Sequence, residues 1–161
     1  MRRLISLAAC AALAACQQQP DQPTNATPAA SPSATPSATA TPVAALARYV
    51  GHYPTDAVAG GTSFLADPAV RAAVATAVPD AAVRARVLDT DVTATPIAEV
   101  DGRVLSYGCE PHNCGPHNWA IALTPDGASG AVCYYDEDRK VARWYPAGAG
   151  PNPAGGCPSG E

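Results

Sequence analysis

The chain has 161 residues, a formal net charge of −4 at pH 7 and 15% charged residues. This mildly acidic balance lacks the positive charge with which proteins bind nucleic acid, so we expect no nucleic-acid partner. Hydrophobic residues make up 47% of the chain, but many of them are alanine, which buries little area per residue. The length fits one folded domain.

The N-terminus has the parts of an export signal. Met1-Arg2-Arg3 is basic, and the apolar stretch 4–15 is too short to span a membrane. It ends in Leu13-Ala14-Ala15-Cys16, which resembles the lipobox of bacterial lipoproteins, where the chain is cut before the cysteine and the thiol is acylated. We therefore expect a lipoprotein signal over 1–16, with a lipid on Cys16 as the chain's only attachment to a membrane.

The residue after the lipobox bears on location. It is Gln17 and not the aspartate that resembles an inner-membrane retention signal, so we expect an outer-membrane lipoprotein that faces the periplasm. The alternative is a soluble periplasmic protein in which Cys16 is free or removed. The stretch that ends in Cys10 leaves too short an apolar region to be the lipobox. Either location is oxidising, and disulfides persist there.

Residues 17–42 are nearly all Gln, Pro, Ser, Thr, Ala and Asn. Such a composition cannot bury enough apolar surface to offset the entropy of ordering, so we expect a disordered tether. The folded domain is expected over 43–161.

Three helices are predicted at the start of this domain. The first is a short helix over 43–50. Asp67-Pro68 then combines an N-cap acid with a proline at the first helical position. Pro79 ends that second helix, and Asp80 caps a third that runs to about Leu88. The second helix has one apolar face, formed at helical spacing by Val70, Ala73, Val74, Ala77 and Val78.

From Pro96 the hydrophobic period changes to two, which is typical of strands. Asp101-Gly102 is the signal of a type I′ hairpin turn. In the stretch 119–123, large apolar residues alternate with alanine, which predicts a strand with one buried face. The expected strands are 97–100, 103–108, 119–123, 131–135 and 141–145. The predicted fold is therefore α+β, an antiparallel sheet of about five strands with helices packed on one face.

Two cysteines five positions apart interrupt this pattern, in the string Cys109-Glu110-Pro111-His112-Asn113-Cys114. A disulfide between them would close a small ring, and Pro111 would stiffen it. His112 would then lie at the tip, where its imidazole can donate and accept hydrogen bonds.

Four cysteines remain once Cys10 and Cys16 are assigned to the signal and the lipid, and four cysteines allow three pairings. We favour Cys109–Cys114 because this pair is nearest in sequence. Cys133–Cys157 would then tie down a tail rich in glycine and proline.

Two other interpretations of the ring remain. Cys109, Cys114 and two histidines, His112 and His117, are ligands that zinc or copper accepts, although their spacing is tight and the compartment favours a disulfide. The ring could also be a pinned turn with an incidental histidine. We expect no metal and no cofactor. No hydrolase or transferase motif is visible, so we expect no enzyme. The acidic run 136–138 is predicted to be a solvated turn.

The string from Cys109 to Cys114 resembles the C-K-P-H-D/N-C loop of the inhibitor of vertebrate lysozyme (Ivy) family, over a likeness that covers roughly 43–145. The resemblance implies a central antiparallel sheet with helices packed against it. It also implies that His112 enters the active cleft of a c-type lysozyme. This chain departs from the pattern, because Glu110 replaces the family's lysine and Asn113 its usual aspartate.

The resemblance implies an inhibitor of c-type lysozyme or of an endogenous muramidase. A retaining lysozyme holds two carboxyl groups about 5 Å apart, and an imidazole between them can hydrogen-bond to both. The alternative is a cell-envelope lipoprotein that binds a metal or a cell-wall component through the same loop. The sequence leaves a homodimer open.

Overall fold

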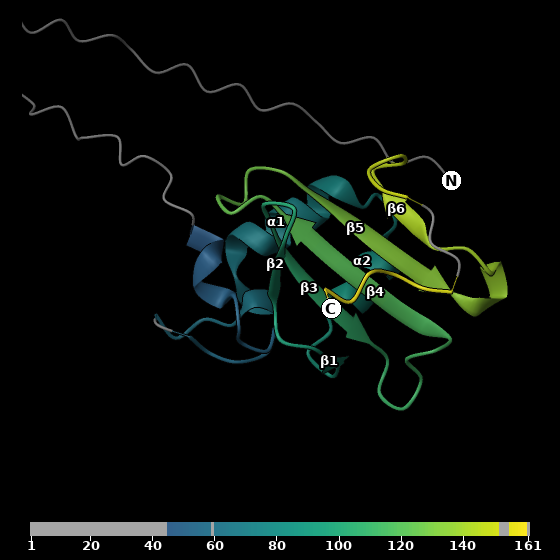
Figure 1. Cartoon of the computed structure of the whole chain (residues 1–161), viewed down its shortest axis with the longest axis horizontal. Helices are drawn as coiled ribbons and strands as arrows, with labels where there is room; N and C mark the ends of the chain where they lie inside the picture. The colour runs from purple at the N-terminus through teal and green to yellow at the C-terminus, as the bar shows by residue number, and fades with distance from the viewer. Residues whose placement is uncertain (1–44, 59, 152–154, 161) are drawn as a thin grey trace, which may run out of the picture. The chain divides into compact units, whose positions relative to one another are not determined.

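The computed structural model describes residues 45–58, 60–151 and 155–160 (Figure 1). The predicted signal peptide over 1–16, with Cys10 and Cys16, lies outside these residues, as does the predicted tether over 17–42. Within the described part of the chain, no helix has the length and hydropathy needed to cross a membrane.

Short helices form the first half of the described chain. They are the 3₁₀ helices η1 (Ala45–Tyr49) and η2 (Phe64–Ala66), followed by the α-helices α1 (Pro68–Ala77) and α2 (Ala81–Val87). The predicted caps are confirmed: Asp67 accepts a hydrogen bond from the Ala69 amide at 2.8 Å, and Asp80 accepts one from Ala82 at 2.8 Å. Each carboxylate satisfies an amide that the first helical turn leaves unpaired.

Six antiparallel strands form one sheet. They are β1 (Thr93–Ala94), β2 (Ala98–Val100), β3 (Arg103–Cys109), β4 (His117–Leu123), β5 (Gly130–Asp136) and β6 (Arg143–Tyr145). Strands β1, β3, β4, β5 and β6 follow one another across the sheet, and β2 also pairs with β3. The predicted α+β fold is confirmed. Strand β1 was not predicted, because two residues are too few to show a period.

The hairpin between β2 and β3 has the predicted turn. Asp101 and Gly102 have φ values of 51° and 71°, and a type I′ turn requires a positive φ at both positions. Val100 pairs with Arg103 across this turn.

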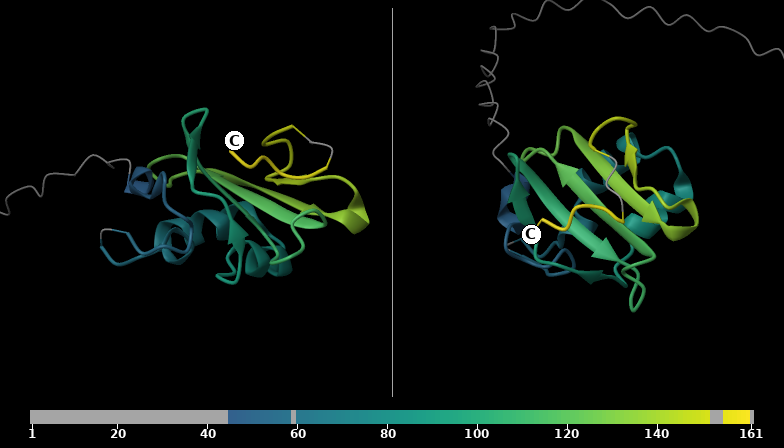
Figure 2. Two further views of the ribbon diagram at one scale, coloured as in Figure 1. Left: turned by 60° about the horizontal axis from the view of Figure 1, so that its bottom comes forward. Right: turned by 45° about the vertical axis from the view of Figure 1, so that its right-hand side comes forward.

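The helices cover one face of the sheet (Figure 2, left). Large side chains fill the space between the layers, where Tyr49 meets Phe64 edge to face at 5.5 Å between ring centroids. The Tyr49 hydroxyl donates to Asp67 at 2.8 Å, so the residue that caps α1 also ties η1 to it. The buried residues of this core are Leu46, Tyr49, Phe64, Leu65, Val70, Val74, Val78, Val83, Val87, Ile97, Val104, Trp119, Ile121, Leu123 and Val132.

The opposite face of the sheet is also covered, which corrects the prediction of one buried face for β4. Ala120 is 0% exposed and Ala122 is 4% exposed. Residues 155–160, at the yellow end of the chain, run across this face (Figure 2), and Cys157 forms a disulfide with Cys133. The alanines gave no clear sign of this cover, because their small side chains mark a buried face less clearly than large apolar ones do.

After β5 the chain turns through the 3₁₀ helix η3 (Glu137–Arg139). Asp136 caps it by accepting a hydrogen bond from the Asp138 amide at 3.1 Å. Glu137 and Asp138 are exposed, which agrees with the predicted solvated turn.

Candidate functional site

The candidate site is the loop between β3 and β4, which projects beyond the ends of the strands (Figure 1). A disulfide joins Cys109 to Cys114, with 4.8 Å between their Cα atoms. Cys133 and Cys157 form the second disulfide. These are the two pairs that the sequence analysis favoured.

A tight turn forms the tip of the ring. The Asn113 amide donates to the Glu110 carbonyl oxygen at 2.9 Å, which closes a four-residue turn with Pro111 and His112 at its centre. His112 has a φ of 62°, and the type II turn requires a positive φ at this position. Glycine is the usual residue there, whereas histidine is exposed at the tip in this chain. A residue held in a sparsely populated conformation is a reason to look for function.

The base of the ring continues the sheet. The Glu110 amide donates to the His117 carbonyl oxygen at 3.2 Å, and the His117 amide donates to the Asn113 carbonyl oxygen at 3.0 Å. Gly108 lies opposite Trp119 across the two strands. A Cβ atom at Gly108 would stand 2.9 Å from the Trp119 indole nitrogen, so the glycine lets the indole lie across β3 directly below the ring.

On the helical side, Arg86 of α2 holds the loop. Its Nη1 donates to Oε1 of Glu110 at 2.8 Å, and Nδ2 of Asn113 donates to Oε2 of the same carboxylate at 2.7 Å. His117 Nε2 lies 3.9 Å from Oε2. The hydrogen bond from Asn113, and after it the charge of Arg86, hold the pKa of Glu110 below its ordinary value, against an opposing effect of desolvation. The sequence did not predict this role for Arg86. It indicated only that Arg86 lies off the apolar face of its helix.

On the other side, Asn118 joins the loop to the C-terminal segment. Its side chain is buried, with Nδ2 donating to the Cys114 carbonyl oxygen at 2.8 Å and Oδ1 accepting from the Cys157 amide at 2.8 Å. One amide group thus links the two disulfides. Sequence reasoning missed Asn118 too, although an asparagine at the start of a strand is a signal, because asparagine is depleted in strands.

The family model described as inhibitor of vertebrate lysozyme (Ivy) matches residues 69–155, which is more than half of the chain. The chain belongs to the Ivy family. The matched region runs from α1 through β6 and contains the whole ring. No curated protein and no solved structure matches the chain. The family is described as one of inhibitors.

The sulfur atoms of the Ivy-type ring are joined to each other. The structure therefore does not offer Cys109 and Cys114 as thiolate ligands for the metal that the alternative interpretation requires. His112 stands at the tip, whereas His117 lies at the base beside Glu110. In residues 45–58, 60–151 and 155–160, no group of three or more His, Cys, Asp and Glu side chains is placed to hold a metal ion.

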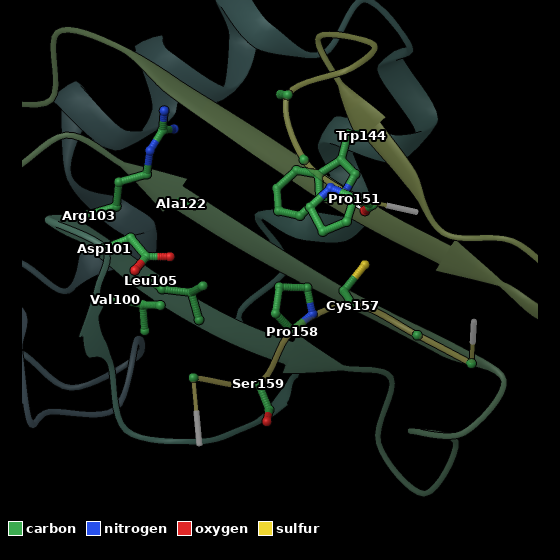
Figure 3. Close-up of a pocket in the computed structure, with 15 residues that line it drawn as sticks. Val100, Asp101, Arg103, Leu105, Ala122, Trp144, Pro151, Cys157, Pro158 and Ser159 are labelled. Carbon is green, nitrogen blue, oxygen red and sulfur yellow. Dashed lines mark hydrogen bonds between the residues drawn. The ribbon is translucent and has the colours of Figure 1, made fainter. Parts of the chain in front are cut away.

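A groove of about 700 Å³ lies on the face that the C-terminal segment covers (Figure 3). Trp144 and Pro151 lie together on one side of it, and Trp144 donates from its indole nitrogen to the Pro151 carbonyl oxygen. Leu105 and Ala122 of the sheet also line the groove. The residues that line it include none from 109–114, so the groove is separate from the Ivy-type ring.

Proposed function

We propose that this chain inhibits a c-type lysozyme, or a muramidase of its own cell envelope, by inserting His112 into the active-site cleft. The observation that carries the proposal is the presentation of this side chain. His112 is exposed, has a positive φ, and lies at the centre of a turn inside a ring closed by a disulfide. Membership of the Ivy family supports lysozyme as the class of target.

The mechanism follows from the two carboxyl groups of a retaining lysozyme. They stand about 5 Å apart, one protonated and one ionised, and a single imidazole between them can donate to one and accept from the other. Hydrogen bonds to an ionised carboxylate in a cleft that excludes water are stronger than those between neutral groups. Because the ring and its turn are already closed in the free protein, little loop entropy is lost on binding.

Charge supports a basic target. The chain has 14 acidic residues and 10 lysines and arginines, and two of the latter, Arg2 and Arg3, belong to the expected signal. The processed protein would therefore be more acidic than the whole chain, and opposite net charges raise the rate of encounter with a basic enzyme.

We place the protein in the outer membrane, facing the periplasm, with a lipid on Cys16. The lipobox and Gln17 support this location. A Cys16→Ser variant should be unprocessed or soluble, whereas Cys10→Ser should still fractionate with membranes. Loss of acylation in the Cys10 variant instead would show that the cleavage site lies elsewhere.

The function is tested by inhibition assays with the purified domain from residue 43 onward. His112→Ala should weaken inhibition of a c-type lysozyme by about 2 kcal/mol or more, the cost of removing a central interface contact, with thermal unfolding unchanged. His117→Ala is the matched control at the base of the ring and should cost less.

A metal-binding loop predicts a different result, in which both histidine variants are equally impaired and a chelator abolishes activity. If wild-type protein inhibits no c-type lysozyme, host lysozymes are excluded as its targets. The same assay would then be run with muramidases of the cell envelope, and failure there would reject the proposed function.

A further inference from the structure

Glu110 is an unexpected residue to carry into an enzyme cleft, because a lysozyme cleft already contains two carboxyl groups. Both of its carboxylate oxygens are engaged within the protein, however. Oε1 accepts from Arg86 at 2.8 Å and Oε2 accepts from Asn113 at 2.7 Å. The acid is therefore not presented to a partner as a free charge.

We propose that Arg86 is a positioning residue for the inhibitory loop, which fixes the Glu110 carboxylate at the base of the turn and neutralises its charge, so that His112 enters the cleft without an unpaired acid beside it. This inference rests on the proposed function. It assigns to α2, which contributes nothing to the ring itself, a direct part in inhibition.

The positioning follows from how α2 is held. Val83 and Val87 are buried in the core, and Asp80 caps the helix, so the backbone that carries Arg86 has a fixed place. From there the guanidinium reaches a residue 24 positions later in the chain. The same carboxylate then takes the hydrogen bond from Asn113, across a turn that the Asn113 amide already closes through the backbone. The first and last residues of the turn are thus tied to each other and to α2.

The neutralisation follows from the surroundings of Glu110. Among the described residues the charged or titratable groups that face it are Arg86 from α2, His117 from β4 at 3.9 Å, and the Tyr134 phenol from β5. Arg86 is the one of these that carries a positive charge at every accessible pH. The exposed fractions of the two side chains are 45% for Arg86 and 31% for Glu110, so water screens the pair in the free protein.

Binding changes this balance. When the loop enters a cleft, water leaves, and like charges repel more strongly in the lower dielectric. A Glu110 without its arginine would then face an ionised carboxylate of the enzyme, whereas the paired Glu110 contributes almost no net charge. The effect of Arg86 is therefore expected in the complex more than in the stability of the free domain.

The test is a set of variants assayed for the inhibition constant against a purified c-type lysozyme. Arg86→Met, which keeps an unbranched side chain but removes the guanidinium and its charge, should weaken inhibition about fivefold or more while the domain stays folded. Arg86→Lys keeps the charge and should retain most of the inhibition. Adding Glu110→Gln to Arg86→Met should restore most of what the single change lost, because no unpaired acid remains. Arg103→Met, at the opposite end of β3, is the matched control and should inhibit like wild type.

Two results would overturn the proposal while the function stands. Arg86→Met that inhibits as well as wild type would remove the positioning role, and a double variant no better than the single one would remove the neutralising role. A carbon-detected NMR titration of Glu110 tests the Arg86–Glu110 pair independently of inhibition. Arg86→Met should raise the pKa of that carboxyl towards its ordinary value. If this shift occurs but wild type inhibits no lysozyme or muramidase, the Arg86–Glu110 pair is present in the free protein, and the proposed function is what fails. The role of Arg86 in inhibition then fails with it.

Discussion

The two faces of the sheet are covered by different means. Between the helices and the sheet lie large side chains such as Phe64 and Ile121, both 0% exposed. Under the C-terminal segment the buried cluster consists of small residues, Ala120, Cys133 and Ala142, and the larger Tyr135 and Trp144 that pack against it are only partly buried. The first face is held by the area it removes from water, which is the dominant favourable term in folding. The second face removes less area and is held by a disulfide and hydrogen bonds.

The loop is attached to both layers. Arg86 reaches it from the helical side and Asn118 from the side of the C-terminal segment. One contact starts from a helix fixed by packing, and the other from a segment fixed by a covalent bond. A loop on a small domain can thus be supported by packing on one side and by a covalent bond on the other, and each support can be removed separately.

The largest expected effect is on the helical face. Ile121→Ala should lower the free energy of unfolding by about 3 to 4 kcal/mol, through lost burial and the cavity that remains. Leu105→Ala is the matched change on the other face, where Leu105 is 5% exposed and borders the groove, and should cost less, about 2 kcal/mol. Urea denaturation of both variants measures the difference. Equal losses would mean that the two faces are packed alike.

Removal of the second disulfide should have the next largest effect. Cys133→Ala with Cys157→Ala should cost about 3 kcal/mol, the usual value for a closed loop of this size, whose ends are 24 residues apart. The C-terminal segment should become sensitive to protease while the helices and sheet remain folded, as circular dichroism can show. A segment that resists protease in the variant would show that its other contacts are sufficient.

A smaller effect is expected at Asn118, where the segment meets the loop. Asn118→Leu should cost about 1 to 2 kcal/mol, because the Cys157 amide loses its buried acceptor. Asn118→Asp keeps that acceptor but loses the donor to the Cys114 carbonyl oxygen, so it should fall between Leu and wild type in thermal unfolding. An aspartate variant as unstable as the leucine variant would contradict the assignment of the two hydrogen bonds.

The smallest effect is the dependence of stability on pH through Glu110. Its pKa is lowered in the folded protein from the ordinary value of 4.5, so its contribution is present above that pH and is lost as the pH falls through the folded value. Wild type should therefore be more stable than Glu110→Gln near neutral pH, and the difference should shrink in acid. Thermal unfolding of both proteins between pH 7 and pH 3 measures it. A difference that grows in acid would contradict the sign.

Local chemistry made much of the fold predictable. Asp67-Pro68 and Asp80 begin helices through contacts with residues two or three positions away, and Asp101-Gly102 sets its turn through backbone conformation alone. The ring was readable for the same reason, because its two cysteines are five residues apart. Strand β1 was not readable, since its two residues pair with a strand that comes later in the chain.

The supports of the loop could not be predicted in this way. The bond from Arg86 to Glu110 spans 24 residues and that from Cys157 to Asn118 spans 39, and both depend on where a helix or a segment packs. In sequence, Arg86 is one polar residue on a helix. The sequence therefore predicted the loop and His112 at its tip. The contacts of Arg86 and Asn118 that hold the loop could be identified only from the fold.

The chain enters the domain at the end of β4 that is remote from the loop. The Leu46 amide donates to the Pro125 carbonyl oxygen at 2.9 Å, just beyond the end of β4, whereas the loop joins the beginning of β4. The point at which the chain enters the domain and the loop are thus separated by the length of β4, about 20 Å. Within the folded domain, the end of the sheet at which residue 46 is fixed is therefore opposite the end that presents His112, so contacts made at one end leave the other end free.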